Sequence, residues 1–311
     1  MSNNNVLVFG PTGAVGRHAA LTAAAQGATV WLAMRDPSKS IPELPSTSPS
    51  YHRIQADLSD ASSLTAAVKK SNAKSAFVYV LQDSSDHMLS AFTALKEAGI
   101  GHVVLLSSYS VQGDPGDQEN QEEHIPRLHA NAEISLRSTG ITYTAIRPAY
   151  FNSNMTWFFG SDLGTGHVRI LYPETKLDWI ASNDIGAVAG IVLAKPPNKT
   201  EIIYLCGPEM LSQRQALGIV GEVLGKKLEV EEVSERQWYE KMVGFPMVLL
   251  EMIARGLSKR GQGSRATIAD YPKETYEEGI RNVERITGRK ATVLRDWVKE
   301  NRAMIEGLGK A

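Results

Sequence analysis

The sequence predicts an α/β fold in which a doubly wound parallel sheet is joined to a smaller, mostly helical C-terminal part. Short apolar runs alternate with helix-like stretches from residue 6 to beyond residue 140, and each connection is long enough to cross over between parallel strands. The first apolar run, residues 6–9, leads directly into three glycines spaced three residues apart and then into an alanine-rich helix. Together these features indicate parallel strands with helices on both faces of the sheet.

The first strand sets the pattern for the others. Its four consecutive large apolar residues are typical of a strand that is buried on both faces. Glycines close two of the predicted helices, Gly27 before the second strand and Gly99 before the fifth. Strands are expected at residues 6–9, 28–34, 51–56, 76–81, 102–106, 142–146 and 201–205, and helices at 14–25, from Asp60 to about 71, 84–98, 126–139 and 185–193.

The remaining residues predict a second part of the chain. We expect residues 1–150, completed by about 179–206, to form a cofactor domain, and residues 151–178 and 207–311 to bind the substrate. Aromatic residues among glycines in residues 155–179 suit a flexible wall over a flat apolar substrate, or plain core packing. In the C-terminal part we expect helices at residues 212–224, 234–252 and 292–308, a less regular one near 276–286, and a strand at 227–233.

Composition argues against several other classes of protein. With 42% apolar and 22% charged residues, the chain is neither disordered nor coiled coil. A net charge of −1 gives no field for nucleic acid, and the basic residues between 241 and 265 stand among glycines, as in a mobile loop. Cys206 is the single cysteine, which excludes a disulfide framework and a cysteine-rich metal site. Without a leader-like start or an 18-residue apolar run, we expect a cytoplasmic monomer or homodimer with no membrane partner and no metal.

The glycine triplet predicts a turn that binds a dinucleotide. Gly10 permits the sharp turn, Gly13 lets a diphosphate approach the backbone, and Gly16 lets the helix pack close to the strand. Unpaired N–H groups and the positive end of the helix dipole attract an anion there. An ordinary strand-to-helix turn is the alternative interpretation. The residues of the turn that we expect at the phosphates are Gly10, Thr12, Gly13, Ala14, Val15 and Gly16.

The end of the second strand predicts NADP(H) as the cofactor. Arg35 is the first polar residue after this strand, and a guanidinium binds the 2′-phosphate of NADP in a bidentate way. Lys39 adds a second positive charge. In the alternative, Arg35 is a surface cation and Asp36 binds the ribose of NAD. Asp57 fits a loop that contacts adenine, although Asp57 is alternatively a turn residue and Ser59 or Asp60 a helix cap. Carboxyl ends of parallel strands meet at one edge, so we also expect Leu58 and Leu81 there.

The motifs resemble the NmrA-like branch of the atypical short-chain dehydrogenases/reductases, which is related to isoflavone reductase-like and NAD(P)H quinone oxidoreductase-like proteins. The resemblance is carried by the glycine turn, by Arg35, by Asn154 and by the segments 129–133, 140–148 and 183–189, and spans about residues 6–205. It implies a Rossmann fold that binds NADP or, in some members, either nicotinamide cofactor. Members reduce ketones, quinones or natural-product intermediates, or have lost catalysis and act as redox-sensing regulators. With the resemblance, Ser107, Pro148 and Asn154 join the residues expected at the cofactor.

The candidate proton donor differs from that of the wider superfamily. Reductases of the wider superfamily carry Tyr and Lys four residues apart on the helix after the fifth strand, and this chain has no such pair there; Tyr172 alone has Lys four residues on, beyond the sixth strand. Where relatives place Lys, the sequence has His129, an imidazole that gives a proton near neutral pH. His129 alternatively pairs with Glu133 on a solvated helix face. Ser108 is expected to bind the carbonyl oxygen, with Tyr109 and Tyr150 as reserve donors.

The sequence therefore predicts an NADPH-dependent reductase of a flat, apolar ketone, enone or quinone-like compound, of aromatic or polyketide type. Two alternatives remain open: a non-catalytic regulator that senses NADP(H), and an enzyme that isomerises or cyclises its substrate without net redox change. The side chains expected at the substrate are Tyr150, Phe151, Trp157 and Phe158.

Overall fold

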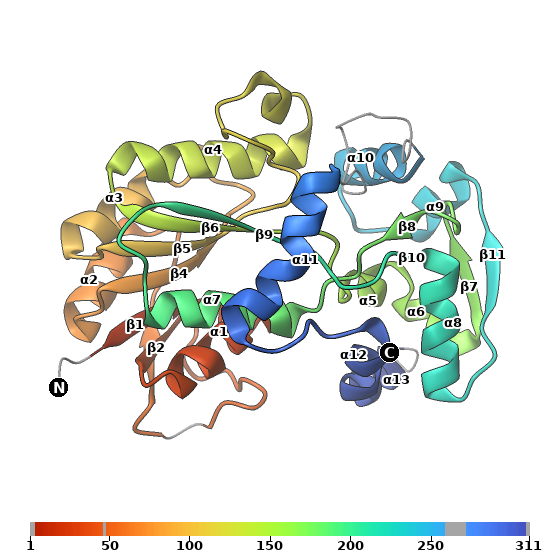
Figure 1. The fold of residues 1–311 in the computed structure, drawn as a ribbon, viewed down its shortest axis with the longest axis horizontal. Helices are drawn as coiled ribbons and strands as arrows, with labels where there is room; N and C mark the ends of the chain where they lie inside the picture. The colour runs from red at the N-terminus through yellow and green to blue at the C-terminus, as the bar shows by residue number, and fades with distance from the viewer. Residues whose placement is uncertain (1–3, 46–47, 259–271, 309–311) are drawn as a thin grey trace. The chain divides into compact units, whose positions relative to one another are not determined.

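The computed structural model describes residues 4–45, 48–258 and 272–308 of the chain (Figure 1). The chain divides into two compact units. Within the described residues, no helix is long and apolar enough to cross a membrane. Unit 1 is formed by Met1–Pro148, Ser182–Tyr204 and Asn282–Arg289, and unit 2 by Ala149–Ala181, Leu205–Arg281 and Lys290–Ala311.

Unit 1 is built on a seven-stranded sheet with the strand order β3-β2-β1-β4-β5-β6-β9. All pairings among the first six strands are parallel. The chain starts in the middle of the sheet and winds outward in both directions, so the predicted doubly wound fold is confirmed. The strands are β1 (Asn5–Phe9), β2 (Thr29–Met34), β3 (Tyr51–Gln55), β4 (Ser75–Tyr79), β5 (His102–Leu106), β6 (Thr142–Pro148) and β9 (Glu201–Leu205).

Helices cover both faces of this sheet (Figure 1). On one face α1 (Ala14–Ala25) packs against α7 (Ser182–Ala194), and their axes approach closely because α7 carries glycine at the contact. A Cβ atom at Gly186 would lie 2.4 Å from the Cβ of His18, and one at Gly190 would lie 2.6 Å from the carbonyl oxygen of Ala19. The helices of the other face are α2 (Ala61–Ser71), α3 (Leu89–Ala98) and α4 (His124–Thr139), packed on a core that includes Leu7, Phe9, Phe92 and Leu105.

Two helices of unit 1 begin later or earlier than expected. Helix α3 begins at Leu89 rather than at residue 84, because Asp86 folds the preceding residues into a turn. Its carboxylate accepts hydrogen bonds from Ser84 and from the backbone N–H groups of Met88 and Ser90. Helix α4 begins two residues before Pro126, which is tolerated in a first helical turn. A short 3-10 helix, η1 (Gln118–Gln121), precedes it.

Unit 2 is mostly helical and contains two small sheets. Strand β7 (His167–Ile170) pairs in parallel with β11 (Glu229–Glu232), and β8 (Lys176–Leu177) pairs antiparallel with β10 (Leu211–Ser212). Helix α11 begins in unit 2 and ends in unit 1. The helices are α5 (Asn154–Phe158), α6 (Gly160–Thr165), α8 (Gln213–Leu224), α9 (Glu235–Lys241), α10 (Met247–Ser258), α11 (Lys273–Thr287), α12 (Leu294–Glu300) and α13 (Arg302–Leu308).

Several expectations for unit 2 were wrong in detail. The helix expected at 234–252 is interrupted between α9 and α10, where Gly244 has a φ of +96° and Pro246 follows. The helix expected at 292–308 is broken at Asn301. Residues 155–179 contain helices and strands rather than a loose wall, and Trp179 is core. Of the basic stretch expected as a mobile loop, Arg255 lies in α10, and residues 259–265 lie outside the described residues.

Candidate functional site

The three glycines of the turn from β1 into α1 differ in whether the fold could accept a larger residue in their place. Gly10 has a φ of +65°, which favours glycine, and a Cβ atom at Gly16 would lie only 2.4 Å from the carbonyl oxygen of Gly10. Gly13 has an ordinary φ of −80° and is exposed, and a Cβ there would meet that oxygen at 3.4 Å, a normal contact. The fold therefore requires glycine at positions 10 and 16 but not at position 13.

The start of α1 is open to an anion. No side chain caps this helix, whose N-cap residue is Gly13, and its first turn contains no acidic residue. The N–H groups of the first helical turn therefore keep their capacity to bind a negatively charged group. Thr12 and Gly13 are exposed beside them.

A polar cleft of about 540 Å³ lies in unit 1, at the carboxyl ends of β2, β3 and β4. It brings together the predicted residues Arg35, Asp57, Leu58 and Leu81. It also contains Tyr79, which the sequence analysis missed; the Tyr79 ring lies against Gly10, where a Cβ would be 2.8 Å from its Cε1 atom. Further polar residues of the lining are Ser59, Gln82, Asp83, Ser84, Ser85, Asp86 and Ser90.

Three carboxylates near the polar cleft accept hydrogen bonds within their own turns through their Oδ1 atoms. Asp36 accepts hydrogen bonds from the Ser38 N–H and hydroxyl groups at 3.0 and 2.6 Å, and these bonds lower the pKa of Asp36. Asp57 is bound in the same way by Ser59, which lowers its pKa, and Asp60 caps α2. Arg35 is different, because it makes no hydrogen bond or ion pair with any residue that the structure describes. Lys39 is exposed but does not line the cleft.

A buried ion pair joins Arg147 at the end of β6 to Glu133 on α4. The Arg147 Nη2 and Nε atoms lie 2.6 and 3.0 Å from the two Glu133 oxygens, and both side chains are fully buried. Ser107 donates a hydrogen bond of 2.5 Å to Glu133, and the Arg147 Nη1 atom donates to the carbonyl of Gly113 and to the hydroxyl of Tyr204. This network connects β5, α4, β6, β9 and the loop after β5.

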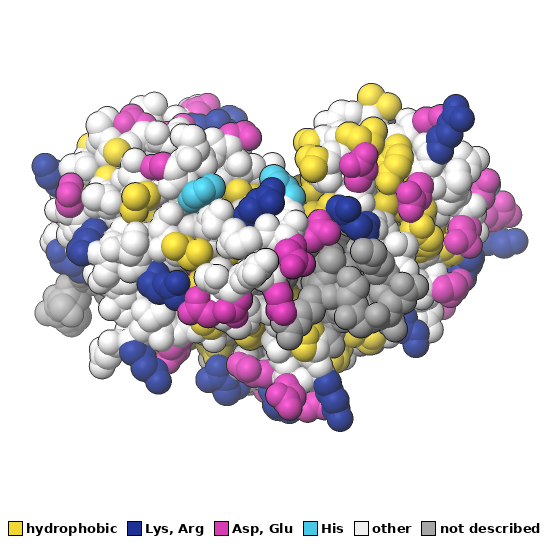
Figure 2. All heavy atoms as spheres, turned by 90° about the horizontal axis from the view of Figure 1, so that it is seen from above, with side chains coloured by type: hydrophobic (Ala, Val, Ile, Leu, Met, Phe, Trp, Pro, Cys, Tyr) yellow, Lys and Arg dark blue, Asp and Glu magenta, His cyan; other side chains and the backbone are white. Residues whose placement is uncertain are grey.

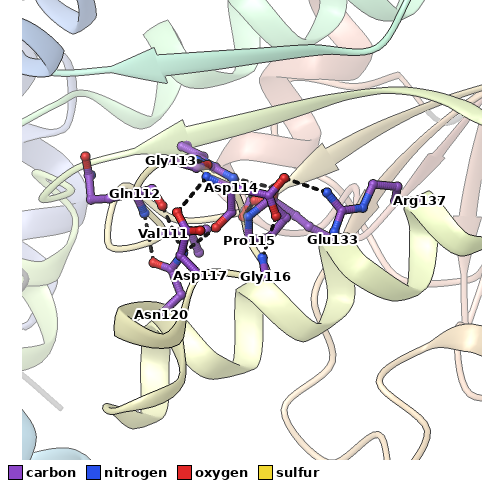
Figure 3. Close-up of polar contacts among 12 residues, drawn as sticks. Val111, Gln112, Gly113, Asp114, Pro115, Gly116, Asp117, Asn120, Glu133 and Arg137 are labelled. Atoms are coloured by element: carbon purple, nitrogen blue, oxygen red, sulfur yellow. Dashed lines mark hydrogen bonds and ion pairs between the residues drawn. The ribbon is translucent and has the colours of Figure 1, made fainter.

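The same loop is also held by hydrogen bonds and an ion pair within and beside it (Figure 3). The Asn120 amide donates to the carbonyls of Gln112 and Asp114 at 2.8 Å each, and Arg137 on α4 forms an ion pair with Asp114 at 2.8 Å. The loop that follows Ser107 and Ser108 is therefore held both by the buried ion pair and by its own polar contacts.

The predicted catalytic residues of unit 1 lie on these connected elements. Ser108 forms a hydrogen bond of 2.8 Å with Ser110, and the buried ring of Tyr109 packs edge-on against Tyr204 at 5.6 Å. His129 lies on α4 one turn before Glu133. The alternative that these two pair on a solvated helix face is wrong, because Glu133 is fully buried and binds Arg147.

His129 has the environment of an uncharged imidazole. Its side chain is partly buried, and its Nδ1 atom is shielded from solvent and has no hydrogen-bond partner among the described residues. Burial lowers the pKa of His129 to about 4. At neutral pH the ring therefore offers one N–H group as a hydrogen-bond donor, and not the imidazolium proton that the sequence analysis expected.

The remaining predicted residues lie in unit 2, except for Pro148, whose carbonyl accepts a hydrogen bond from Tyr109 in unit 1. Tyr150 is buried, its N–H group donates to Asp178 at 2.8 Å, and burial raises the pKa of its phenol, which stays protonated. Asn154 is the first residue of α5, and Phe151 is half-buried. The roles of these residues at the cofactor and the substrate stay predictions.

Aromatic side chains gather in unit 2. Phe158 is buried against Trp238 and Phe245, with ring centres 6.1 and 6.5 Å apart, whereas Trp157 is 67% exposed. Trp238 and Phe245 were missed, although both stand in the sequence segment predicted as a helix. Figure 2 shows further hydrophobic side chains on the surface of this unit. Unit 2 also contains a nearly filled cavity of about 10 Å³. It is lined by Tyr150, Phe158, Phe159, Leu171, Gln213, Trp238, Ile253 and Leu257.

Comparison with known proteins places the chain in a family. Residues 2–294 match the model of the NmrA-like family. A nitrogen metabolite regulation-like protein, bik4, from Gibberella fujikuroi is 35% identical over 95% of this chain and 96% of its own length. The (4-alkanoyl-5-oxo-2,5-dihydrofuran-3-yl)methyl phosphate reductase of Streptomyces griseus is 26% identical over 95% of this chain and 97% of its own.

A solved structure shares the fold. The NADPH-dependent quinone oxidoreductase QOR2 from Escherichia coli, complexed with NADPH, superposes with a TM-score of 0.71 at 19% identity and covers 95% of this chain and 99% of its own. In the described residues, no group of three or more His, Cys, Asp or Glu side chains is placed to hold a metal. The family match over nearly the whole chain, the glycine turn and the doubly wound sheet lead to one conclusion: the chain belongs to the NmrA-like family.

Proposed function

We propose that this protein binds NADP(H) in unit 1 and reduces a flat, apolar ketone, enone or quinone-like substrate. The main observation that supports cofactor binding is the glycine at position 13. Its backbone conformation suits any residue, and a Cβ would fit beside Gly10. A glycine without a folding reason, next to an uncapped helix start, is explained by a ligand that approaches the backbone closely.

The described residues fit this cofactor. The first turn of α1 would hold the pyrophosphate, and Arg35, whose guanidinium makes no hydrogen bond or salt bridge with the described residues, would bind the 2′-phosphate. The Asp36 Oδ1 atom accepts both hydrogen bonds from Ser38, which makes Asp36 part of its own turn, and we assign the recognition of the adenosine ribose to Arg35. Asp57, Leu58 and Leu81 would border the adenosine in the polar cleft.

NADPH, when bound, supplies the hydride for the reduction. The chain's own residues have the task of orienting the substrate carbonyl and stabilising the negative charge that forms on its oxygen. We assign Ser108 and the neutral His129 N–H group to that oxygen as hydrogen-bond donors, with Tyr109 and Tyr150 as reserves. The buried phenol of Tyr150 keeps its proton at all physiological pH values. Phe151, Trp157 and Phe158 are assigned to the flat face of the substrate.

The reductases among the relatives support this proposal. The Streptomyces griseus relative is named as a reductase of an oxo-dihydrofuran, and the Escherichia coli structure is named as an NADPH-dependent quinone oxidoreductase. Both names describe conjugated carbonyl or quinone substrates.

A second function is a non-catalytic regulator that senses NADP(H). Two observations favour it: the 35% identical relative is named as a regulation-like protein, and the chain lacks a Tyr and Lys pair four residues apart on α4. Such a regulator would keep the glycine turn and Arg35 while losing turnover.

Two measurements test the proposals in sequence. Titration calorimetry with NADPH and NADH should show tighter binding of NADPH, and Arg35→Ala should reduce that preference by about 10- to 100-fold, because a charge-assisted contact contributes about 1.5 to 3 kcal/mol. Equal affinities in the unmutated protein would reject NADP(H) selection. NADPH oxidation, followed at 340 nm with a panel of quinones and enones, should then show turnover; tight NADPH binding without any turnover would favour the regulator.

A further inference from the structure

We infer that Arg53 is a positioning residue for cofactor selection. It fixes the turn at residues 36–39, which directly follows Arg35 and ends at Lys39. In this way it orients the two cations, Arg35 and Lys39, for the 2′-phosphate. This inference rests on the proposed NADP(H) binding and deepens it, because it names a residue that contacts no cofactor and yet sets the preference. The argument depends only on contacts within unit 1.

Arg53 reaches the turn from the neighbouring strand. In the parallel pairing of β2 with β3, Arg53 is opposite Leu32, and its side chain extends toward the end of β2. One nitrogen, Nη1, donates hydrogen bonds to two backbone carbonyls, that of Pro37 at 2.9 Å and that of Lys39 at 2.5 Å. A single guanidinium therefore ties together two carbonyls on opposite sides of Ser38.

The turn is also held from within. Asp36 accepts hydrogen bonds from the Ser38 N–H group at 3.0 Å and from its hydroxyl at 2.6 Å, and the Lys39 N–H donates to the Asp36 carbonyl at 3.3 Å. Pro37 restricts the backbone further. These local bonds give the turn its shape, but they do not attach it to the sheet. Arg53 supplies that attachment.

The attachment is made by a side chain with restricted freedom. Arg53 is half-buried, and its Nε atom is shielded from solvent and has no hydrogen-bond partner among the described residues. An arginine keeps its charge at all pH values and presents its N–H donors in a rigid plane, so its two bonds hold the carbonyls in a fixed geometry. Arg35 and Lys39 are both exposed and would otherwise move with a free turn.

The consequence concerns the difference between two cofactors. NADH lacks the 2′-phosphate, so its binding does not depend on the position of Arg35 or Lys39. NADPH gains from these cations only if they face the phosphate when it arrives, because ordering them on binding costs free energy. Loss of Arg53 should therefore weaken NADPH binding and leave NADH binding unchanged.

The test measures the ratio of the NADH and NADPH dissociation constants by calorimetry in four proteins: wild type, Arg53→Met, Arg35→Ala/Lys39→Ala, and the triple variant. Lys69→Met serves as the matched control, because it removes one exposed positive charge from the last turn of α2. Urea unfolding of each variant checks that it is folded before titration.

We expect Arg53→Met to lower the ratio by about 3- to 10-fold, a part of the about 10- to 100-fold that a charge-assisted phosphate contact provides. The NADH dissociation constant and the ratio in Lys69→Met should stay at the wild-type values. In the Arg35→Ala/Lys39→Ala background, Arg53→Met should change nothing further, because the residues through which it acts are gone.

Three results would overturn the inference. An unchanged ratio in a folded Arg53→Met protein removes Arg53 from cofactor selection while the proposed function stands. A further loss in the Arg35→Ala/Lys39→Ala background means that Arg53 touches the phosphate itself and is not a positioning residue. Equal NADPH and NADH affinities in the wild type reject the proposed cofactor selection and this inference together.

Discussion

The polar cleft and the buried ion pair both lie at strand ends of the sheet in unit 1, yet they treat their arginines in opposite ways. Arg35 in the cleft is exposed and makes no hydrogen bond or salt bridge with the described residues, although its charge acts on nearby Asp57. Arg147 is fully buried and donates to Glu133, Gly113 and Tyr204. The difference separates a binding function from a structural one, because a cation can bind a ligand only with donors that the fold has not already used.

The polar cleft and the buried ion pair also differ in the free energy needed to remove their charges from water on folding. Burying Arg147 and Glu133 removes both charges from water, and only their close bidentate geometry and the added hydrogen bonds offset that cost. Arg35 stays in water until a ligand arrives, so it costs the fold little. Variants of the buried ion pair should therefore change stability first, and variants of the cleft should change binding first.

Removing one member of the buried ion pair should have the largest effect. Glu133→Ala leaves the Arg147 guanidinium buried without its carboxylate, which should lower the free energy of unfolding by about 3 to 5 kcal/mol in urea denaturation. Glu133→Gln, which keeps an acceptor oxygen, serves as the milder comparison. A loss of less than about 1 kcal/mol for Glu133→Ala would show that the pair is not a structural centre.

Filling the glycine turn should separate binding from folding. Gly13→Val should weaken NADPH binding by at least about 100-fold, because the branched side chain occupies the space of the pyrophosphate. Its circular dichroism spectrum should change little, since the φ of −80° at this position suits valine. The contrast is Gly16→Ala, whose Cβ would lie 2.4 Å from the Gly10 oxygen and should destabilise the fold. Wild-type NADPH affinity in folded Gly13→Val would make position 13 merely structural.

If His129 has the proposed role in turnover, its loss should appear in kcat and hardly in binding. His129→Ala should lower kcat by about 100-fold, the lower end of what a positioned proton donor or hydrogen-bond donor contributes, while NADPH affinity changes much less. Ser108→Ala is the companion variant, because Ser108 is assigned to the same oxygen. A normal kcat in His129→Ala would move the assignment to Tyr109 or Tyr150.

Acid should destabilise the protein through His129, with the smallest of these effects. Its folded pKa of about 4 lies below the ordinary 6.5, so the unfolded chain binds a proton first as the pH falls. The stabilisation is complete above pH 6.5 and is lost as the pH falls toward 4. Between pH 7 and 5 this should remove about 1 to 2 kcal/mol from the free energy of unfolding. His129→Gln should make the pH dependence less steep but not flat, because burial also lowers the pKa of His102 to about 4. An equal slope in both proteins would contradict the contribution of His129.

The sequence predicted the polar cleft better than the buried ion pair, for a physical reason. Gly13 and Arg35 are recognisable because the fingerprint of a dinucleotide-binding turn has fixed positions relative to a strand and a helix. Glu133 and Arg147 are 14 residues apart on different elements, and their pairing exists only once α4 has packed against β6. Periodicity places Glu133 on a helix but does not say whether that face is buried.

The boundaries of the helices also fall into two groups, those that the sequence signals and those that depend on contacts in the fold. Gly244 and Pro246 are helix-breaking residues, so the sequence contains a signal for the end of α9, although one continuous helix was predicted there. Asn301, which separates α12 from α13, is not a strong breaker, and the turn around Asp86 depends on side-chain bonds to Ser84 and Ser90. These helix boundaries depend on side-chain contacts rather than on the helix propensity of single residues. Tyr79 and the serines of the polar cleft were missed for the same reason, because their place in the cleft also depends on contacts between elements.

The division of the chain between its units has a consequence for biosynthesis. Unit 1 includes the late segment Asn282–Arg289, where the Asn282 amide donates to the Tyr204 carbonyl at 2.9 Å and Arg289 forms a 2.6 Å ion pair with the buried Asp184. A ribosome must translate past residue 289 before every segment of unit 1 exists. The glycine turn is made within the first 16 residues, so a nascent chain carries an unfinished unit 1 for most of its synthesis.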